Sequence, residues 1–312
     1  MFLLSGCASL YPDGAPPTEI QAETDTVAVD TTPIAPITVT PLGREPWNFE
    51  LPGVAIVLSN SQPAYADVAV ELAERLDNYE VFDLGDDSEP PVSVPRRVND
   101  SNSSVVVAIG LRAARSAVAM SQKPVIFSQV FNHQEYQLLT ESSRGVAAIA
   151  PLDAQLAAWK QIDPTIVRVG FIIGEGHEEL IAEAQRAAEK HDIELRVQVT
   201  TSDQETLYFF RRMIRDIDGF WLFPDNRILS GRVLQEMLAD AKRQQVPVTA
   251  PSEAMLELGA TISISTVAAD IARTIVKVVR EVNSGNIGAL PPITQLSEIR
   301  VLTSGAIQVV GR

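Results

Sequence analysis

The stretch Gly219-Phe-Trp-Leu-Phe-Pro-Asp-Asn-Arg-Ile-Leu-Ser-Gly231 decides the fold class of this chain. Phe220 to Phe223 is an unbroken apolar run, which favours a strand buried on both faces of a parallel sheet. Pro224 ends the run, because proline lacks the N–H that a sheet ladder needs. Leucines and alanines at helical spacing then predict a helix from about Ile228 through Arg243. A buried strand therefore passes directly into a helix, which is typical of α/β proteins.

Asp225 and Asn226 lie where this strand gives way to the helix. In open α/β sheets, ligands bind just outside the carboxyl ends of the strands, so both side chains are candidates for ligand contacts. The alternative is a structural role, because Asp and Asn also favour turns and cap helices. From this stretch alone both interpretations stay open.

Strands and helices alternate along the rest of the chain from about Trp47. The first part predicts strands near 54–58, 81–84, 105–109, 124–127 and 145–149, with helices near 65–76 and 111–120 and a Pro-rich acidic loop over 85–95. After a break near Pro151 the pattern restarts, with helices near 152–159, 178–190, 204–215 and 267–284 and strands near 166–173, 193–199, 246–249 and 260–264. Short strands near 294–302 and 306–310 complete the chain. This order predicts an α/β fold of two doubly wound parallel-sheet lobes with a hinge and a central cleft.

We therefore divide the chain into five segments: a lipoprotein signal remnant (1–7), a disordered tether (8–46), lobe one (47–150), lobe two (151–266), and a return helix with C-terminal hinge strands (267–312). The tether is rich in Pro, Thr, Ala and Asp, and cannot bury enough apolar surface to fold. Gly285 is expected to close the return helix.

Composition and motifs exclude several classes of function. The formal net charge of −15 argues against a nucleic-acid partner, because phosphate binding needs basic surface. The three histidines are scattered and no His/Cys/Asp/Glu cluster has metal-ligand spacing, so we expect no metal and no cofactor. No segment is apolar for long enough to span a bilayer. No nucleophile elbow or phosphate-cradling loop appears, and Gly174-Glu-Gly-His177 is too short for a dinucleotide fingerprint, so we do not expect an enzyme.

The single cysteine follows Leu4-Ser5-Gly6, and Leu4 to Cys7 resembles the lipobox of bacterial lipoproteins. That resemblance implies a cleaved signal peptide and a lipid-modified Cys7, which the acidic tether would hold away from the membrane. Ala8 resembles the residue found in lipoproteins sorted to the outer membrane of enteric-type bacteria. The implied location is the cell envelope, on the periplasmic face of the outer membrane. A chance tetrapeptide is the alternative.

Several stretches resemble a known family: Val107-Ala-Ile-Gly110 followed by Ala113-Ala114, Lys123-Pro-Val-Ile-Phe127, Val167-Arg-Val-Gly-Phe171, Phe223-Pro-Asp-Asn226, and Val246-Pro-Val248 followed by Glu253 and Leu258-Gly259-Ala260. In this order they are similar to the ABC-transporter substrate-binding proteins of the tryptophan/tyrosine-type branch. The resemblance covers about residues 54–301. It implies a type I periplasmic-binding fold, a small molecule in the cleft, closure on binding, and a membrane permease as partner.

The chain departs from the family pattern at several positions. Leu111 and Arg112 stand where the family has a small hydroxyl residue, and Phe131-Asn132-His133 replaces an Asp-Pro turn. Ser265-Thr266-Val267 and Asp270 stand where a tyrosine-containing turn and a glycine are expected. The first lobe is also predicted to lack a strand–helix stretch between about Leu84 and Ser101. These departures indicate a ligand other than the family's usual one, or a degenerate site.

The resemblance and the strand-end rule together give the candidate ligand contacts: Ser59, Asn60, Gln62, Arg112, Gln129, Phe131 and Asn132 in lobe one, and Glu175, Asp225, Asn226, Ser252 and Glu253 in lobe two. Helix N-termini and turn amides would hold an anionic group, and Arg112 could bind a carboxylate bidentately. Asp225 or Glu253 would pair with an ammonium, and Phe131 could stack on an apolar part. For each residue the alternative is a helix cap or a solvated loop position.

Two hypotheses follow for the function. In the first, an envelope-anchored lipoprotein binds a small polar ligand, amino-acid-like or a related metabolite, for ABC-type uptake or sensing. In the second, an outer-membrane lipoprotein uses a degenerate binding-protein fold as an interaction module for an envelope protein. The long tether, Ala8 and the altered cleft positions motivate the second hypothesis.

Overall fold

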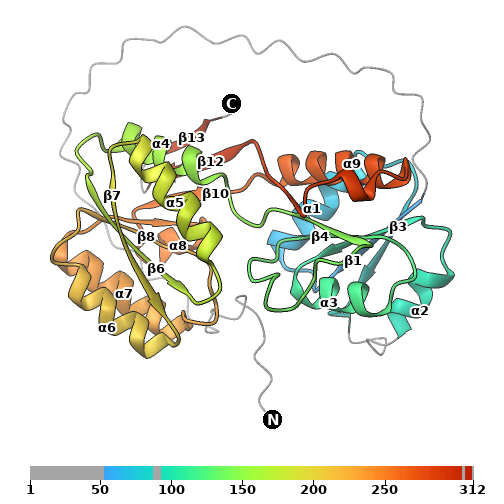
Figure 1. The fold of residues 1–312 in the computed structure, drawn as a ribbon, viewed down its shortest axis with the longest axis horizontal. Helices are drawn as coiled ribbons and strands as arrows, with labels where there is room; N and C mark the ends of the chain where they lie inside the picture. Colours follow the sequence, from blue (N-terminus) through green and yellow to red (C-terminus); the bar gives the residue numbers. More distant parts are fainter. Residues whose placement is uncertain (1–52, 87–92, 304–305, 311–312) are drawn as a thin grey trace, which may run out of the picture.

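The structure, a computed structural model, describes residues 53–86, 93–303 and 306–310. The predicted signal remnant, Cys7 and the predicted tether lie outside the described residues. Two α/β lobes stand side by side (Figure 1). Each has a central sheet with helices on both faces, which confirms the predicted fold class.

Lobe one contains a six-stranded parallel sheet in the order β11-β5-β4-β3-β1-β2. Its strands are β1 (Val54–Leu58), β2 (Tyr79–Asp83), β3 (Val105–Ile109), β4 (Val125–Ser128), β5 (Ser143–Val146) and β11 (Ile293–Thr294). Its helices are α1 (Pro63–Ala73), α2 (Ser93–Asp100), α3 (Leu111–Met120) and α9 (Ala268–Asn283), and the 3-10 turn η1 (Ile287–Ala289) follows α9. The central strands β1 and β3 are buried along their whole length, as continuous Val/Ile/Ala runs require.

Lobe two contains a seven-stranded sheet in the order β13-β12-β10-β9-β8-β6-β7. Its strands are β6 (Arg168–Gly174), β7 (Glu194–Thr200), β8 (Gly219–Trp221), β9 (Val248–Ala250), β10 (Ile262–Ser265), β12 (Ile299–Thr303) and β13 (Ala306–Val310). Its helices are α4 (Leu152–Ile162), α5 (Glu178–Lys190), α6 (Asp203–Met213), α7 (Gly231–Gln244) and α8 (Ala254–Glu257). Strand β12 pairs antiparallel with both β10 and β13, so this sheet is only mostly parallel.

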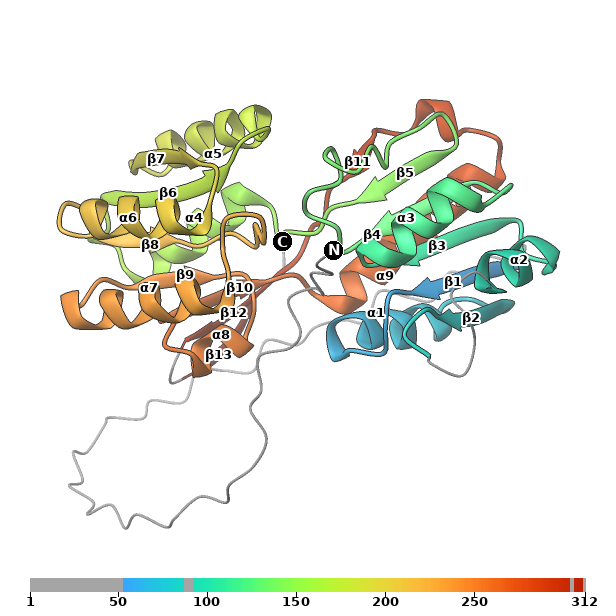
Figure 2. The same cartoon turned by 90° about the horizontal axis from the view of Figure 1, so that it is seen from below.

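The chain passes between the two sheets repeatedly. It crosses from β5 to α4, from β10 to α9, and from β11 to β12 (Figures 1 and 2). Because the crossings are far apart in sequence, the lobes are linked by several parallel connections rather than by one linker. Within the described residues no helix is both long and apolar enough to cross a membrane.

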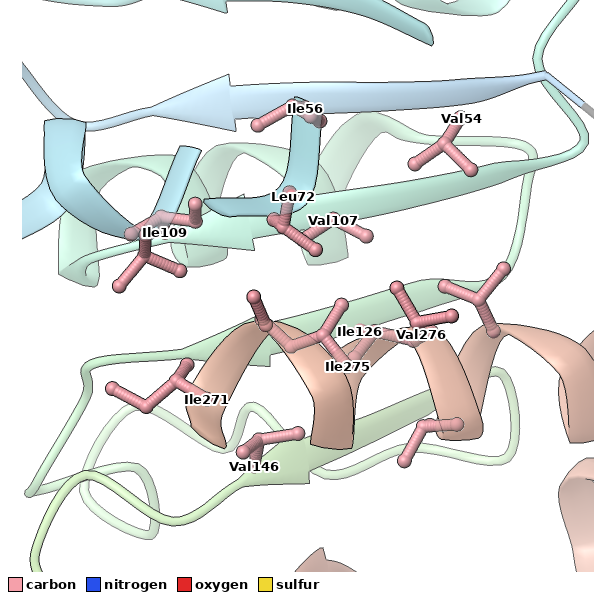
Figure 3. Close-up of a cluster of buried hydrophobic side chains, with 14 of the residues drawn as sticks. Val54, Ile56, Leu72, Val107, Ile109, Ile126, Val146, Ile271, Ile275 and Val276 are labelled. Carbon is pink, nitrogen blue, oxygen red and sulfur yellow. The ribbon is translucent and has the colours of Figure 1, made fainter. Parts of the chain in front are cut away.

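Helix α9 belongs to lobe one although it follows most of lobe two in the sequence. Ile271, Ile275 and Val279 repeat at a spacing of four residues and are buried. Figure 3 shows Ile271 and Ile275 facing the sheet, in the same cluster as Leu72 of α1. The core of lobe one is therefore completed only after most of lobe two has been synthesised.

The first lobe was predicted to lack a strand–helix stretch between about Leu84 and Ser101, and helix α2 corrects the helix part of that prediction. Val94 and Val98 lie one turn apart and are buried against Phe82 and the sheet. Pro95 lies in the first turn of the helix, where a missing N–H costs no hydrogen bond. The Pro-rich composition was therefore a poor guide to the end of this segment.

The position of Ile275 gives a test of the role of α9. We expect Ile275→Ala to lower the free energy of unfolding by about 2–5 kcal/mol, because it removes a fully buried side chain from a packed core. Urea unfolding followed by far-UV circular dichroism measures the change. Lys277→Ala, an exposed position in the same helix, serves as the control. Equal effects of the two substitutions would contradict the assignment of α9 to the core of lobe one.

Candidate functional site

Polar side chains from both lobes meet where β4, β6 and β8 end. The loop after β4 contributes Asn132, the turn after β6 contributes His177, and the segment after β8 contributes Asp225, Asn226 and Arg227. We call these five residues the junction cluster. Asn132, His177 and Asp225 are buried, whereas Asn226 is exposed. The strand-end rule thus locates a real convergence of polar groups.

Asp225 is the most buried charge of the cluster, with 1% of its surface exposed. Its Oδ1 accepts hydrogen bonds from Asn132 Nδ2 (3.2 Å), Arg227 N (3.2 Å) and Arg227 Nε (2.9 Å). Its Oδ2 accepts from Gly174 N (3.0 Å) and Arg227 Nη2 (2.8 Å). Burial raises the pKa of this carboxyl, but the hydrogen bonds and charge of Arg227 outweigh burial and hold the pKa below its ordinary value of 3.8.

Gly174 makes room for the pair formed by Asp225 and Arg227. A Cβ at this position would lie 2.6 Å from Asp225 Oδ2 and 2.7 Å from Arg227 Nη2. The last residue of β6 must therefore be a glycine if the guanidinium is to lie against the strand. Asp225 in turn raises the pKa of Arg227, so the pair is a charged one.

Asn132 connects lobe one to lobe two by hydrogen bonds. Its Nδ2 donates to Asp225 Oδ1 and to Asn226 Oδ1 (3.3 Å), and its Oδ1 lies 2.9 Å from His177 Nε2. This orientation requires His177 Nε2 to carry the proton and donate it to Asn132. Burial lowers the pKa of His177 below its ordinary value of 6.5, Asp225 offsets part of the shift, and Arg227 adds to it.

Phe131 and Glu135 reach lobe two from the same loop. The Phe131 ring centroid lies 5.0 Å from that of His177 and 6.1 Å from that of Phe223. A carboxylate oxygen of Glu135 lies 3.6 Å from Arg227 Nε. The loop after β4 therefore closes against lobe two with an aromatic contact, an amide bridge and an ion pair.

The other predicted contacts in lobe one serve local structure. Ser59 Oγ accepts the N–H of Ala113 in the first turn of α3 (3.0 Å), and Asn60 Oδ1 accepts the N–H of Gln62 (3.0 Å). Arg112 donates to the carbonyl oxygen of Leu84 (3.2 Å). Gln129 has a left-handed backbone, with φ at 60°.

In lobe two, Glu175 is exposed in the turn after β6, and Ser252 lies beside α8. Glu253 forms an ion pair with Arg300 of β12 (2.9 Å). The structure thus brings Phe131, Asn132, Asp225 and Asn226 together.

The alternative role of Asp225 and Asn226 as helix caps needs correction. Neither Asp225 nor Asn226 caps the following helix: α7 begins at Gly231, and Ser230 Oγ accepts the N–H of Val233 (3.4 Å). The Asp225 carboxylate is drawn into the junction cluster instead. His177, Arg227 and Glu135 were not predicted, although Arg227 lies two residues after Asp225, a spacing that allows the chelation seen here.

The described residues contain no group of three His, Cys, Asp or Glu side chains arranged to hold a metal ion. The arrangement offers instead hydrogen-bond donors, a buried ion pair and an aromatic face. Such a combination suits the non-covalent binding of a small polar molecule.

Comparison with known sequences now places the chain. The sequence profile described as "ABC transporter substrate binding protein" matches residues 72–304. The chain belongs to the ABC transporter substrate-binding protein family. This is a family of binding proteins rather than of enzymes. No curated protein matches the sequence.

Solved structures share the fold of this substrate-binding protein. A conserved domain protein from Vibrio cholerae is 18% identical, with a TM-score of 0.55 over 81% of this chain and 92% of its own. The ABC domain from Streptococcus pneumonia in complex with L-Trp is 19% identical, with a TM-score of 0.56 over 81% and 91%. A ligand-free, open substrate-binding protein with adhesive properties from Clostridium difficile is 14% identical, with a TM-score of 0.61 over 81% and 92%. The fold is that of the type I periplasmic-binding proteins.

The lowered pKa of His177 predicts a pH dependence of stability. Below pH 6.5 the unfolded chain binds a proton at this position more readily than the fold does, so the free energy of unfolding falls as the pH decreases toward the folded pKa. We expect His177→Gln to reduce this slope, as measured by urea unfolding between pH 7.5 and about pH 5.

The charged groups that act on the His177 ring are Asp225, Arg227, Glu178 and His133. Burial also lowers the pKa of His133. We therefore expect His133 to cause part of the pH dependence of stability, which persists in His177→Gln and is lost in His133→Gln. Identical slopes for the wild type and His177→Gln would show that His177 is not held neutral by the fold.

Proposed function

We propose that this substrate-binding protein takes a small polar ligand, amino-acid-like or a related metabolite, between its lobes at the junction cluster. The single observation that carries the proposal is that buried polar groups from both lobes hydrogen-bond to each other through Asn132. A ligand that contacts Asn132 of lobe one and cluster residues of lobe two together would stabilise the closed arrangement of the lobes, because it touches both lobes at once.

The wider role follows from the family. An ABC-type binding protein delivers its ligand to a membrane permease or reports its presence, and we propose uptake or sensing with no enzymatic step. Lipidation at Cys7 would anchor the chain in the cell envelope, with the segment 8–46 as spacer. The predicted segments 47–150, 151–266 and 267–312 serve in this proposal as lobe one, lobe two, and the return helix with the C-terminal hinge strands.

The alternative is an interaction module for an envelope protein. The observation that favours it is the internal satisfaction of the junction cluster, in which Asn132 and Arg227 already occupy the Asp225 carboxylate. In that case Ser59, Asn60, Gln62, Arg112 and Gln129 would have no ligand role.

Ligand binding can be tested by a thermal-shift screen of the full chain against amino acids, their metabolites, nucleosides, sugars and small peptides. A ligand at a hundred times its dissociation constant adds about 2.7 kcal/mol of stability, a shift of several degrees for a chain of this size. We expect Asn132→Ala to remove the shift, because it takes away the residue that bridges the lobes.

Asn286→Ala is the matched control, since this exposed asparagine lies beyond the end of α9, far along the chain from the cluster. A shift that survives Asn132→Ala would place the ligand elsewhere. If no compound in the panel raises the melting temperature, the interaction module is favoured over ligand binding.

The lipid anchor has its own test. In a bacterial host that processes lipoproteins, the chain with its native leader should partition into the membrane fraction and incorporate labelled fatty acid. Cys7→Ser should abolish both membrane partitioning and fatty-acid incorporation, because the Cys7 sulfur is the atom that receives the lipid. Incorporation of label into Cys7→Ser would contradict lipidation at this position.

A further inference from the structure

We infer that the junction cluster recognises its ligand through a carboxylate, bound by Arg227 and Asn226, and not through an ammonium bound by Asp225. The inference rests on the proposed function, because it names the chemical class of ligand for the same site. It reverses the role that the sequence assigned to Asp225, and it gives the carboxylate to Arg227 instead of Arg112.

The acceptor capacity of Asp225 is already used. An ionised carboxylate offers about four lone-pair positions. Here three donors reach Oδ1 and two reach Oδ2, from Asn132, Gly174 and Arg227. A ligand ammonium would have to displace the Arg227 guanidinium from a buried carboxylate. That exchange is unfavourable, because Arg227 Nε and Nη2 already bond both carboxylate oxygens, whereas a ligand ammonium would lose its own hydration on entering the buried site.

The free hydrogen-bonding groups of Arg227 and Asn226 are donors. Arg227 uses Nε and Nη2 on Asp225, and within the described part of the chain its Nη1 makes no hydrogen bond. Asn226 accepts from Asn132 through Oδ1, and its Nδ2 is likewise unpaired among the described residues. Both residues keep surface open to solvent, so a small molecule can reach them. N–H donors on a cation are what a carboxylate binds best.

The guanidinium is also fixed in direction before a ligand arrives. It lies against the backbone of Gly174, in the space that any Cβ would fill, and Asp225 holds one of its edges. A cation held in this way loses little side-chain freedom on binding, which favours affinity for an anion. Arg112 lacks these features: it is exposed and bonded to the carbonyl oxygen of Leu84.

Glu135 is the internal group that a ligand carboxylate would replace. Its carboxylate lies 3.6 Å from Arg227 Nε, a distance that allows charge attraction without a well-formed hydrogen bond. The other charged group facing the guanidinium is Asp225, and Tyr136 also lies close enough to affect the pKa of Arg227. A ligand carboxylate that binds Nη1 would therefore compete with the Glu135 carboxylate for the Arg227 guanidinium.

Matched sets of probes test the inference on the unmodified full chain. Isothermal titration compares an amino acid with its analogue lacking the amine and its analogue lacking the carboxylate. The sets are L-tryptophan, 3-indolepropionate and tryptamine; L-phenylalanine, 3-phenylpropionate and phenethylamine; and L-leucine, 4-methylpentanoate and isopentylamine. We expect the carboxylate analogue to bind within tenfold of the amino acid, and the amine to bind at least tenfold more weakly than either.

Variants then assign the effect to Arg227. Arg227→Gln should weaken the carboxylate probe at least tenfold, and it should strengthen the amine because Asp225 loses its internal cation. Arg227→Lys should retain part of the carboxylate affinity, since it keeps the charge but not the planar fork. Arg232→Gln, an exposed arginine at the start of α7, should change neither. Circular dichroism confirms that each variant is folded.

Two outcomes overturn the inference and are distinguishable from each other. If the amine binds as well as the amino acid while the carboxylate analogue does not bind, the site recognises an ammonium through Asp225. The proposed function then stands, and this inference fails. If no probe in the sets and no molecule in the wider panel binds, both the proposed function and the inference fail. Because the probe comparison uses the unmodified chain, neither outcome depends on the folding of a variant.

Discussion

The ion pair between Asp225 and Arg227 is the constraint on which the lobe junction depends. A buried carboxylate is tolerated only when it is paired and hydrogen-bonded, and here one arginine two residues away supplies three of its hydrogen bonds. Burying that pair needs space beside β6, which the absence of a side chain at Gly174 provides. The remaining acceptor position on Oδ1 is then available to Asn132, and through it the first lobe engages the second. The contact between lobes is therefore a consequence of local chemistry within lobe two.

The chain crossings between the lobes limit how the lobes can move about this contact between Asn132 and lobe two. Asp270 in the first turn of α9 is buried and accepts hydrogen bonds from the N–H groups of Ser297 and Glu298, in the segment that joins β11 to β12. The second and third crossings are thus tied together at the base of α9. A relative movement of the lobes must bend both segments at once, which confines the movement to a hinge near the crossings. The sequence had marked Asp270 only as a departure from the family pattern.

Apolar runs and helical spacing were sufficient to predict the alternation of strands and helices, because buried parallel strands and amphipathic helices leave a strong pattern. They missed α2, where a proline near the start and two arginines hide a short apolar stripe formed by Val94 and Val98. The strand-end rule found Asn132 and Asp225, which meet in the junction cluster, but could not separate them from residues that serve local structure. Ser59 Oγ accepts an N–H in the first turn of α3, which lies 54 residues further along the chain, so this structural role could not be predicted from the sequence around Ser59. His177 was missed because its partners come from distant segments that only the fold brings together.

The internal satisfaction of the junction cluster is compatible with a working site if the closing contacts are few. Between the lobes the cluster has the amide bridges of Asn132, the Phe131 ring against His177 and Phe223, and the partly exposed pair of Glu135 with Arg227. A hydrogen bond between neutral groups contributes about 0.5–1.5 kcal/mol, the one to the ionised Asp225 about 1.5–3 kcal/mol, and an exposed ion pair about 0–1 kcal/mol. Their sum is within the range that one ligand can supply by binding the closed arrangement more tightly than the open one, since a shift from 1:99 to 99:1 needs about 5.5 kcal/mol. The contacts that close the lobes without a ligand are thus weak enough to be exchanged for contacts with one, whereas the buried pair beneath them is strong enough to stay in place.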